Sequence, residues 1–212
     1  MTALQNRLLS FGLRFAIAAV VFQTAVHLLN AIFLDKRALN VNFEDNLFAW
    51  ASTVATFSVA FVATVRAAGL TRDRMRYVLL AIVAAFVSLD DMVAIHEDVG
   101  TEAAELFGLP QSYDSVLWPA FYLPLLALGL FLLFLLAREA PERPRRFIQA
   151  GLALLAAALA AEVLSGPWTG GEEEWPHVLE GAFEEAAELA AWILVASALT
   201  VTTLGEFLSE RR

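Results

Sequence analysis

The feature that most constrains this chain is a series of long apolar segments. They cover residues 11–34, 46–66, 77–96, 115–137, 147–165 and 178–204. A helix of about 20 apolar residues crosses the hydrocarbon core of a bilayer, and a segment in lipid must satisfy its backbone hydrogen bonds internally. The connections are too short to hold a second domain. The sequence therefore predicts an all-α integral membrane protein, with residues 1–212 forming one bundle of six transmembrane helices.

Charged residues divide unevenly between the two sides of this predicted bundle. The side that holds both termini and the second and fourth connections carries 12 basic and 5 acidic residues. The opposite side carries Lys36 and Arg37 against 18 acidic residues. Connections rich in Lys and Arg stay in the cytoplasm. Because arginine also outnumbers lysine thirteen to one, as in GC-rich bacterial genomes, we predict a bacterial cytoplasmic membrane protein with both termini cytoplasmic.

Two local signals lie on the predicted outer side. Residues 101–107 are amphipathic and are followed by Gly108 and Pro110, which predicts a short interfacial helix in the loop after the third span. Pro119 and Pro124 lie within the fourth span. Prolines inside a helix kink it, and a kink here would open the bundle toward the outer leaflet.

Polar side chains interrupt the outer halves of the spans, and they lie at similar depths when counted at 1.5 Å per residue. Helical spacing places Asp90 and Glu97 on one face of the third span. It also places His177, Glu180, Glu184 and Glu188 along one face of the sixth. These side chains, with His27 and Glu162, are predicted to form one polar layer in the bundle.

No basic residue lies in the outer half of any predicted span to neutralise these carboxylates. Charged groups at such depth are costly and mark functional sites. Histidine and carboxylate ligands together suit zinc, iron or manganese, and helix bundles hold metal sites in their cores. We therefore predict a divalent transition metal. Its ligands would come from the set His27, Asp90, Asp91, His96, Glu180 and Glu184.

The function that follows from such a site is metal-dependent hydrolysis of a lipid or another amphiphile that enters from the outer leaflet. The metal would acidify a bound water, and Glu97 or Glu188 would act as the general base. Two alternatives remain open. One is a membrane protein that binds or senses a metal or pH without catalysis. The other is a cation or proton transporter, ranked lower because the inner halves of the spans lack ionisable side chains.

Plainer interpretations of the same residues also stand. The carboxylates would share protons or line a hydrated vestibule, and Glu180 near a helix N-terminus would favour the helix dipole. His27 would be a core histidine bonded to Asn30 or Gln23. The chain has no cysteine, which excludes disulfides and thiolate ligands. Nothing in the sequence indicates binding of nucleic acid, and it does not predict an oligomeric state.

The run that begins Leu89-Asp90-Asp91 and ends His96-Glu97 resembles an element of uncharacterised bacterial multi-pass membrane proteins. The resemblance covers about ten residues. It implies a membrane location and no particular activity.

Overall fold

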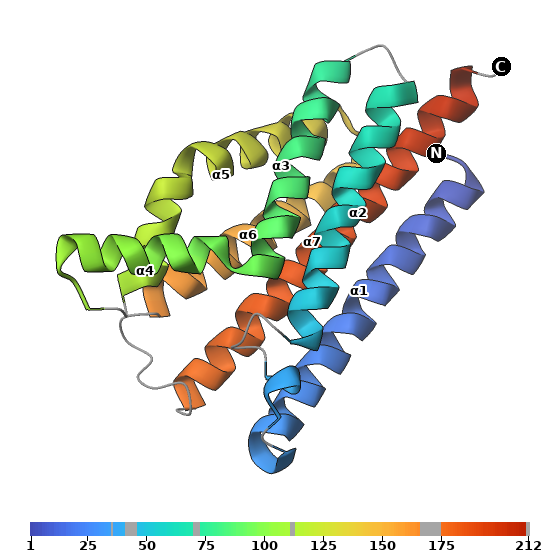
Figure 1. Ribbon diagram of the computed structural model, residues 1–212. Helices are drawn as coiled ribbons and strands as arrows, with labels where there is room; N and C mark the ends of the chain where they lie inside the picture. The colour runs from blue at the N-terminus through green and yellow to red at the C-terminus, as the bar shows by residue number, and fades with distance from the viewer. Residues whose placement is uncertain (35, 41–45, 70–72, 111–112, 166–174, 211–212) are drawn as a thin grey trace.

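The structure is a computed structural model that describes residues 1–34, 36–40, 46–69, 73–110, 113–165 and 175–210. Within those ranges the chain forms seven α-helices and no strand (Figure 1). A π-helical turn, Asn30–Leu34, extends the first helix, and a short 3-10 helix spans Arg37–Leu39. The α-helices are α1 (Ala3–Leu29), α2 (Leu47–Gly69), α3 (Arg74–Val93), α4 (Ile95–Phe107), α5 (Asp114–Glu139), α6 (Glu142–Ser165) and α7 (Trp175–Glu210).

The length and hydropathy of these helices confirm a multi-pass membrane protein. In the described residues, five helices are long and apolar enough to cross a bilayer: α1 with its π-helical extension, α2, α5, α6 and α7. The number becomes six if α3 and α4 together count as one span. The all-α class is therefore confirmed, and the number of spans is five to six.

The predicted third span, residues 77–96, is wrong as a single straight helix. α3 ends at Val93, and the chain bends by 71° into α4. The bend occurs at Ala94, whose φ of 54° and ψ of 36° are left-handed. A residue in this conformation ends a right-handed helix. The helix predicted for residues 101–107 therefore exists but begins earlier, at Ile95.

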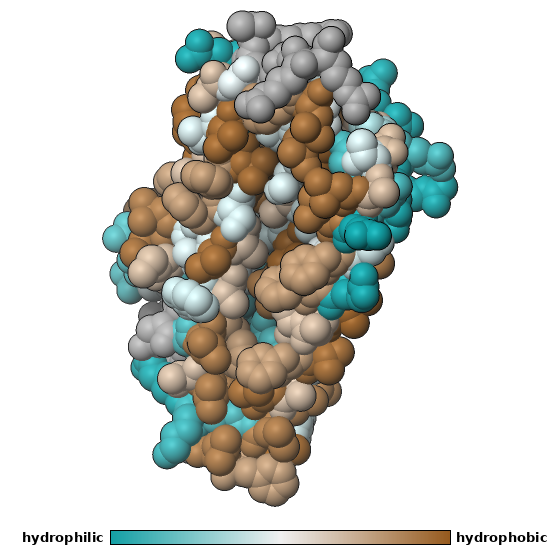
Figure 2. Space-filling view, turned by 90° about the vertical axis from the view of Figure 1, so that its right-hand side faces the viewer, coloured by the Kyte–Doolittle hydropathy of each residue, from teal (hydrophilic) through white to brown (hydrophobic). Residues whose placement is uncertain are grey.

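Large hydrophobic side chains are exposed on the outside of the bundle. Phe22 on α1, Phe61 on α2 and Phe131 on α5 are 61%, 60% and 56% exposed. Figure 2 shows hydrophobic side chains along most of one face, with hydrophilic ones toward its ends and edges. A soluble protein rarely exposes so continuous an apolar surface. In a membrane, this surface contacts lipid.

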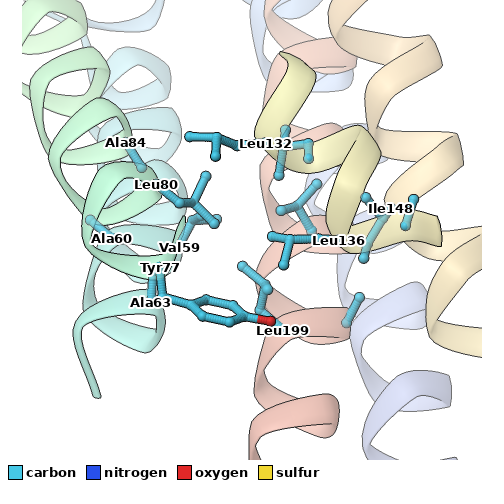
Figure 3. Close-up of a cluster of buried hydrophobic side chains, with 14 of the residues drawn as sticks. Val59, Ala60, Ala63, Tyr77, Leu80, Ala84, Leu132, Leu136, Ile148 and Leu199 are labelled. Carbon is cyan, nitrogen blue, oxygen red and sulfur yellow. The ribbon is translucent and has the colours of Figure 1, made fainter. Parts of the chain in front are cut away.

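A cluster of buried hydrophobic side chains packs the part of the bundle where α2 ends and α3 begins (Figure 3). There Val59 of α2, Leu80 of α3, Leu136 of α5 and Leu199 of α7 join one buried cluster. Small residues allow neighbouring helices to approach closely. At Gly151 of α6, an added Cβ would lie only 2.7 Å from Cγ2 of Val195 on α7.

The fifth helix carries its two prolines inside a continuous helical segment. Figure 1 shows α5 changing direction along its length. Pro119 and Pro124 each remove a backbone donor and crowd the preceding turn, which bends a helix. The bend gives α5 the shape that lets it wrap around the pocket described next.

Candidate functional site

One pocket gathers half of the predicted polar layer, namely Asp90, Glu162, Glu184 and Glu188. It has a volume of about 160 Å³ and lies among α3, α4, α5, α6 and α7. Its polar lining consists of Asp90, Asp91, His96, Trp118, Tyr122, Glu162, Glu184, Glu185 and Glu188. Its apolar lining includes Leu80, Val83, Leu126, Leu130, Leu133, Leu155 and Trp192. We call it the acidic pocket.

The acidic pocket is elongated, with polar and apolar ends. Asp90 and Leu80 both line it from α3, and ten residues of helix separate them by about 15 Å along the axis. Leu80 and Leu133 belong also to the buried core. The apolar end of the pocket therefore stops at the tightly packed half of the bundle.

Asp90 contacts two side chains of the pocket. It is 7% exposed. One oxygen lies 2.9 Å from Nδ1 of His96, and the other accepts a hydrogen bond of 2.8 Å from the hydroxyl of Tyr122. His96 reaches Asp90 because the bend at Ala94 turns the start of α4 back over the end of α3. The geometry is that of a histidine whose ring is oriented by a carboxylate.

Aromatic rings form one wall of the polar end. The ring centroid of Trp118 lies 4.8 Å from that of His96 and 5.6 Å from that of Tyr122, the latter in an edge-to-face arrangement. Trp118 and Tyr122 are four residues apart on α5 and therefore share a face. Neither residue was among those predicted from the sequence. Their i, i+4 spacing beside the prolines is the signal that would have identified them.

Glutamates from α6 and α7 form the other wall. Nε1 of Trp118 donates a hydrogen bond of 2.5 Å to Glu162. The carboxyl group of Glu184 lies within hydrogen-bonding reach of those of Glu162 and Glu180. Carboxylates so close together require a proton or a cation between them. Glu162 was predicted to lie in the polar layer but not among the ligands, and the structure places it at the centre of this group.

Asp91 has a different environment from Asp90, although both line the pocket. The hydroxyl of Thr53 on α2 donates to Asp91 over 3.0 Å. Ser88 in turn donates to the backbone carbonyl of Thr53 over 3.0 Å. Asp91 therefore ties α3 to α2 at the edge of the pocket.

Three predicted site residues, His27, Glu97 and Glu180, do not line the acidic pocket. His27 is 1% exposed, and its Nε2 lies 3.1 Å from the backbone carbonyl of Val178 on α7. A second backbone hydrogen bond joins it to Leu39. Glu97 does not line the pocket, and the bend at Ala94 removes the helix face that it was predicted to share with Asp90.

The remaining predicted ligand, Glu180, contacts the pocket through Glu184. Its own carboxylate lies 3.7 Å from Nδ1 of His177. The donor types around the pocket fit a transition metal. Within the described ranges, however, no three His, Asp or Glu side chains are arranged to hold one ion together. The structure joins Asp90 with His96, and Glu184 with Glu162 and Glu180.

Comparison with known proteins identifies the family. No curated protein and no solved structure matches the chain. One family model, described as a domain of unknown function (DUF8692), matches residues 10–203. This match includes every residue of the acidic pocket and most of the chain, and the protein therefore belongs to the DUF8692 family.

Proposed function

We propose that this membrane protein binds a single-chain amphiphile with an ammonium-type headgroup in the acidic pocket. One observation supports this proposal above the others. A continuous cavity runs from a carboxylate-lined end to a leucine-lined end, and no lysine or arginine occurs among its described lining residues. A ligand that matches both ends carries a positive charge at one end and an alkyl chain at the other.

The polar end suits an ammonium group for two reasons. Six carboxyl groups line the pocket, and Glu184 is near enough to Glu162 to need a cation or proton between them. Trp118 and Tyr122 add aromatic rings beside the carboxylates. Aromatic faces attract organic cations, and quaternary ammonium groups are bound in this way. An anionic headgroup would meet repulsion from every wall.

The apolar end limits the size of the ligand. A cavity of about 160 Å³ is close to the roughly 150 Å³ of a cavity that accepts benzene. Such a space accommodates part of one alkyl chain, whereas a sterol or both chains of a phospholipid would not fit. Because Leu80 and Leu133 also belong to the core, the pocket is closed at this end, which favours binding over transport.

Alkyl ions of equal chain length test the proposal. Wild-type protein in nanodiscs would be titrated with decyltrimethylammonium and with decyl sulfate, with Trp118 and Trp192 fluorescence as the signal and empty nanodiscs as the reference. Saturable binding is expected for the ammonium ion alone. Asp90→Asn and Glu184→Gln should each weaken it about tenfold, whereas Glu105→Gln, an exposed acid of α4 outside the pocket, should not. Equal binding of decyl sulfate would refute the proposal.

A metal-dependent hydrolase is the second candidate, and a separate observation favours it. The Asp90–His96 pair and the Glu162–Glu184 pair line one cavity. A divalent metal between them would supply an acidified water, and Glu188 lies in the same lining to accept its proton. Elemental analysis of protein purified without chelators tests this. Stoichiometric metal that is lost in Asp90→Ala and Glu184→Ala is expected, and metal retained in both variants would exclude it.

A further inference from the structure

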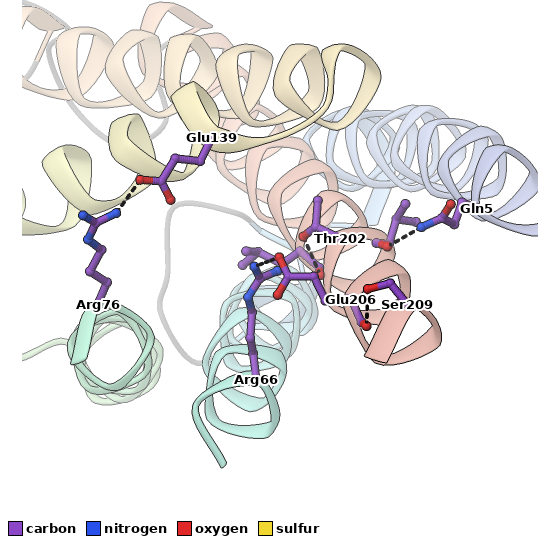
Figure 4. A network of polar contacts seen from close by, with 9 residues as sticks. Gln5, Arg66, Arg76, Glu139, Thr202, Glu206 and Ser209 are labelled. Carbon is purple, nitrogen blue, oxygen red and sulfur yellow. Dashed lines mark hydrogen bonds and ion pairs between the residues drawn. The ribbon is translucent and has the colours of Figure 1, made fainter. Parts of the chain in front are cut away.

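A second pocket lies at the end of the bundle where α2 ends and α3 begins, which Figure 1 shows near both chain termini. Figure 4 shows polar side chains of this region. Its volume is about 560 Å³, and we call it the Arg66 pocket. It is lined by the adjoining ends of α2, α3, α5, α6 and α7. Tyr77, Leu136, Ile148 and Leu199 line it and also belong to the buried core. The core therefore separates this pocket from the acidic pocket.

Arg66 is the buried cation of this pocket, with 8% of its surface exposed. Its Nη2 donates to the carboxylate of Glu206 on α7. The guanidinium carbon lies 4.2 Å from the centroid of the Tyr77 ring, which fixes its plane. Among the described residues, Nε and Nη1 of Arg66 have no hydrogen-bond partner. A buried guanidinium with unused donors is costly, and an oxyanion is the group that would satisfy them.

The other charges around the pocket restrict which oxyanion fits. Glu206, Glu139 and Asp73 line the pocket, and Arg66 is the single basic side chain among the described lining residues. Arg76, which is outside the lining, forms ion pairs with Glu139 and Asp73. Glu206 forms an ion pair with Arg66, and its side chain is 47% exposed. A simple anion would face this carboxylate, whereas a zwitterion would present an ammonium group to it.

Hydroxyl groups support the ammonium position. Thr202 donates to the carbonyl of Leu199, and Ser209 donates to that of Glu206. Both hydroxyl protons are therefore used along α7, and the oxygen lone pairs remain as acceptors. Both residues line the pocket beside Glu206 (Figure 4). Acceptors alone suit an ammonium group, which has donors and no acceptor.

We propose that the Arg66 pocket binds a phosphoethanolamine group, with its phosphate on Arg66 and its ammonium group beside Glu206. The pocket volume lies within the range of small-molecule sites. Phosphatidylethanolamine headgroups and free phosphoethanolamine share this chemistry. Basic pockets between transmembrane helices bind anionic headgroups, whereas the acidic side chains beside Arg66 in this pocket favour a zwitterionic one. This proposal is independent of what the acidic pocket binds.

The experiment compares lipid and free ligand on the full chain. The thermal midpoint would be measured in nanodiscs of phosphatidylcholine with added phosphatidylethanolamine or phosphatidylglycerol, and in detergent with free phosphoethanolamine. Arg66→Gln is the test variant. Arg146→Gln is the matched control, because Arg146 also pairs with a glutamate but is 73% exposed.

Stabilisation of the wild type by phosphatidylethanolamine, and not by phosphatidylglycerol, would support the lipid headgroup as the ligand. Stabilisation by free phosphoethanolamine alone would support the soluble ligand. In either case Arg66→Gln should weaken the apparent affinity about tenfold or more, with Arg146→Gln unchanged. No stabilisation by either source, or equal stabilisation by phosphatidylglycerol, would refute the proposal.

A second variant keeps the proposal testable if Arg66→Gln fails to fold. Glu206→Gln retains an acceptor for Arg66 but removes the charge that faces the ammonium group. It should reduce the preference for phosphatidylethanolamine over phosphatidylglycerol. A preference that persists in full would show that Glu206 does not face an ammonium group, and the zwitterionic ligand would be excluded.

Discussion

A carboxylate below the lipid headgroups needs donors close to it, and Asp90 has two. His96 and Tyr122 approach different oxygens of the same carboxylate. They come from α4 and α5, so this one side chain links three helices. Deletion of a partner therefore affects both the stability of the bundle and the orientation of His96 toward the pocket.

Tyr122→Phe removes only the hydroxyl group that donates to Asp90, and it therefore tests this hydrogen bond between α5 and α3. It should lower the free energy of unfolding by about 1 kcal/mol, the value of a typical hydrogen bond, and it should also weaken alkylammonium binding. Unfolding in nanodiscs monitored by circular dichroism gives the stability. Tyr113→Phe is the control, because Tyr113 is 40% exposed and lies outside the pocket lining. Equal effects of the two substitutions would contradict a specific role for the Tyr122 hydroxyl.

His27, unlike Asp90, is a buried polar residue outside the pocket, and it forms hydrogen bonds with backbone groups. His27→Leu should destabilise the protein by about 1–3 kcal/mol, because the carbonyl of Val178 loses its partner in a buried place. Binding of decyltrimethylammonium and any bound metal should be unchanged. A variant that folds normally but loses ligand or metal would restore His27 to the functional site.

At the scale of elements, the bend between α3 and α4 shapes the acidic pocket. In a straight helix, residue 96 would lie about 9 Å along the axis from residue 90. In the structure, Nδ1 of His96 lies 2.9 Å from a carboxylate oxygen of Asp90. The left-handed conformation of Ala94 produces this return. In this conformation the Cβ of alanine crowds the following carbonyl oxygen, and glycine, which has no Cβ, avoids this contact.

Ala94→Gly should therefore raise the free energy of unfolding by about 1 kcal/mol. Ala94→Val should lower it, because a β-branched side chain tolerates this conformation worst. The matched control is Ala85→Gly, on an exposed position within α3, where glycine should cost about 1 kcal/mol. Destabilisation by glycine at both positions would show that Ala94 does not adopt the left-handed conformation in the membrane.

The last helix connects the two pockets. α7 has 36 residues, which is about 54 Å of helix and exceeds the roughly 30 Å of a hydrocarbon core. It contributes Glu184 and Glu188 to the acidic pocket and Thr202 and Glu206 to the Arg66 pocket. The predicted span, residues 178–204, lies within it. The helix begins three residues before the predicted span and ends six residues after it.

At the scale of the whole molecule, the two ends of the bundle differ in charge and in packing. The end with the chain termini holds the buried core and the Arg66 pocket, and the other end holds the acidic pocket. Figure 1 shows the start of α1, the end of α2, the start of α3 and the end of α7 at one end of the bundle. The distribution of basic residues predicts that this end faces the cytoplasm, and that orientation remains a prediction.

Single cysteines test the orientation, since the chain has none of its own. Glu142→Cys at the start of α6 and Glu105→Cys on α4 are both at exposed positions. An impermeant maleimide should label position 105 on intact cells and position 142 only after permeabilisation, because basic connections stay in the cytoplasm. Labelling of both positions from the same side would contradict the predicted arrangement.

Apolar segments and charge distribution determined the class of this protein from its sequence. A run of about 20 apolar residues has one stable solution in lipid, the helix, so its identity does not depend on its neighbours. The positions of the acidic residues relative to these apolar runs also predicted that the carboxylates gather in one half of the bundle. The sequence also predicted that Asp90, His96 and Glu184 lie close together, and all three line the acidic pocket.

Only the tertiary structure decided which of these side chains meet. The backbone conformation of Ala94 returns His96 to Asp90, and the packing of α5 brings Trp118 and Tyr122 to the carboxylates. The same packing places His27 against α7, where it hydrogen bonds with the backbone. Helical periodicity specifies a face within one helix, but contacts between helices depend on bends and packing that arise from the whole bundle.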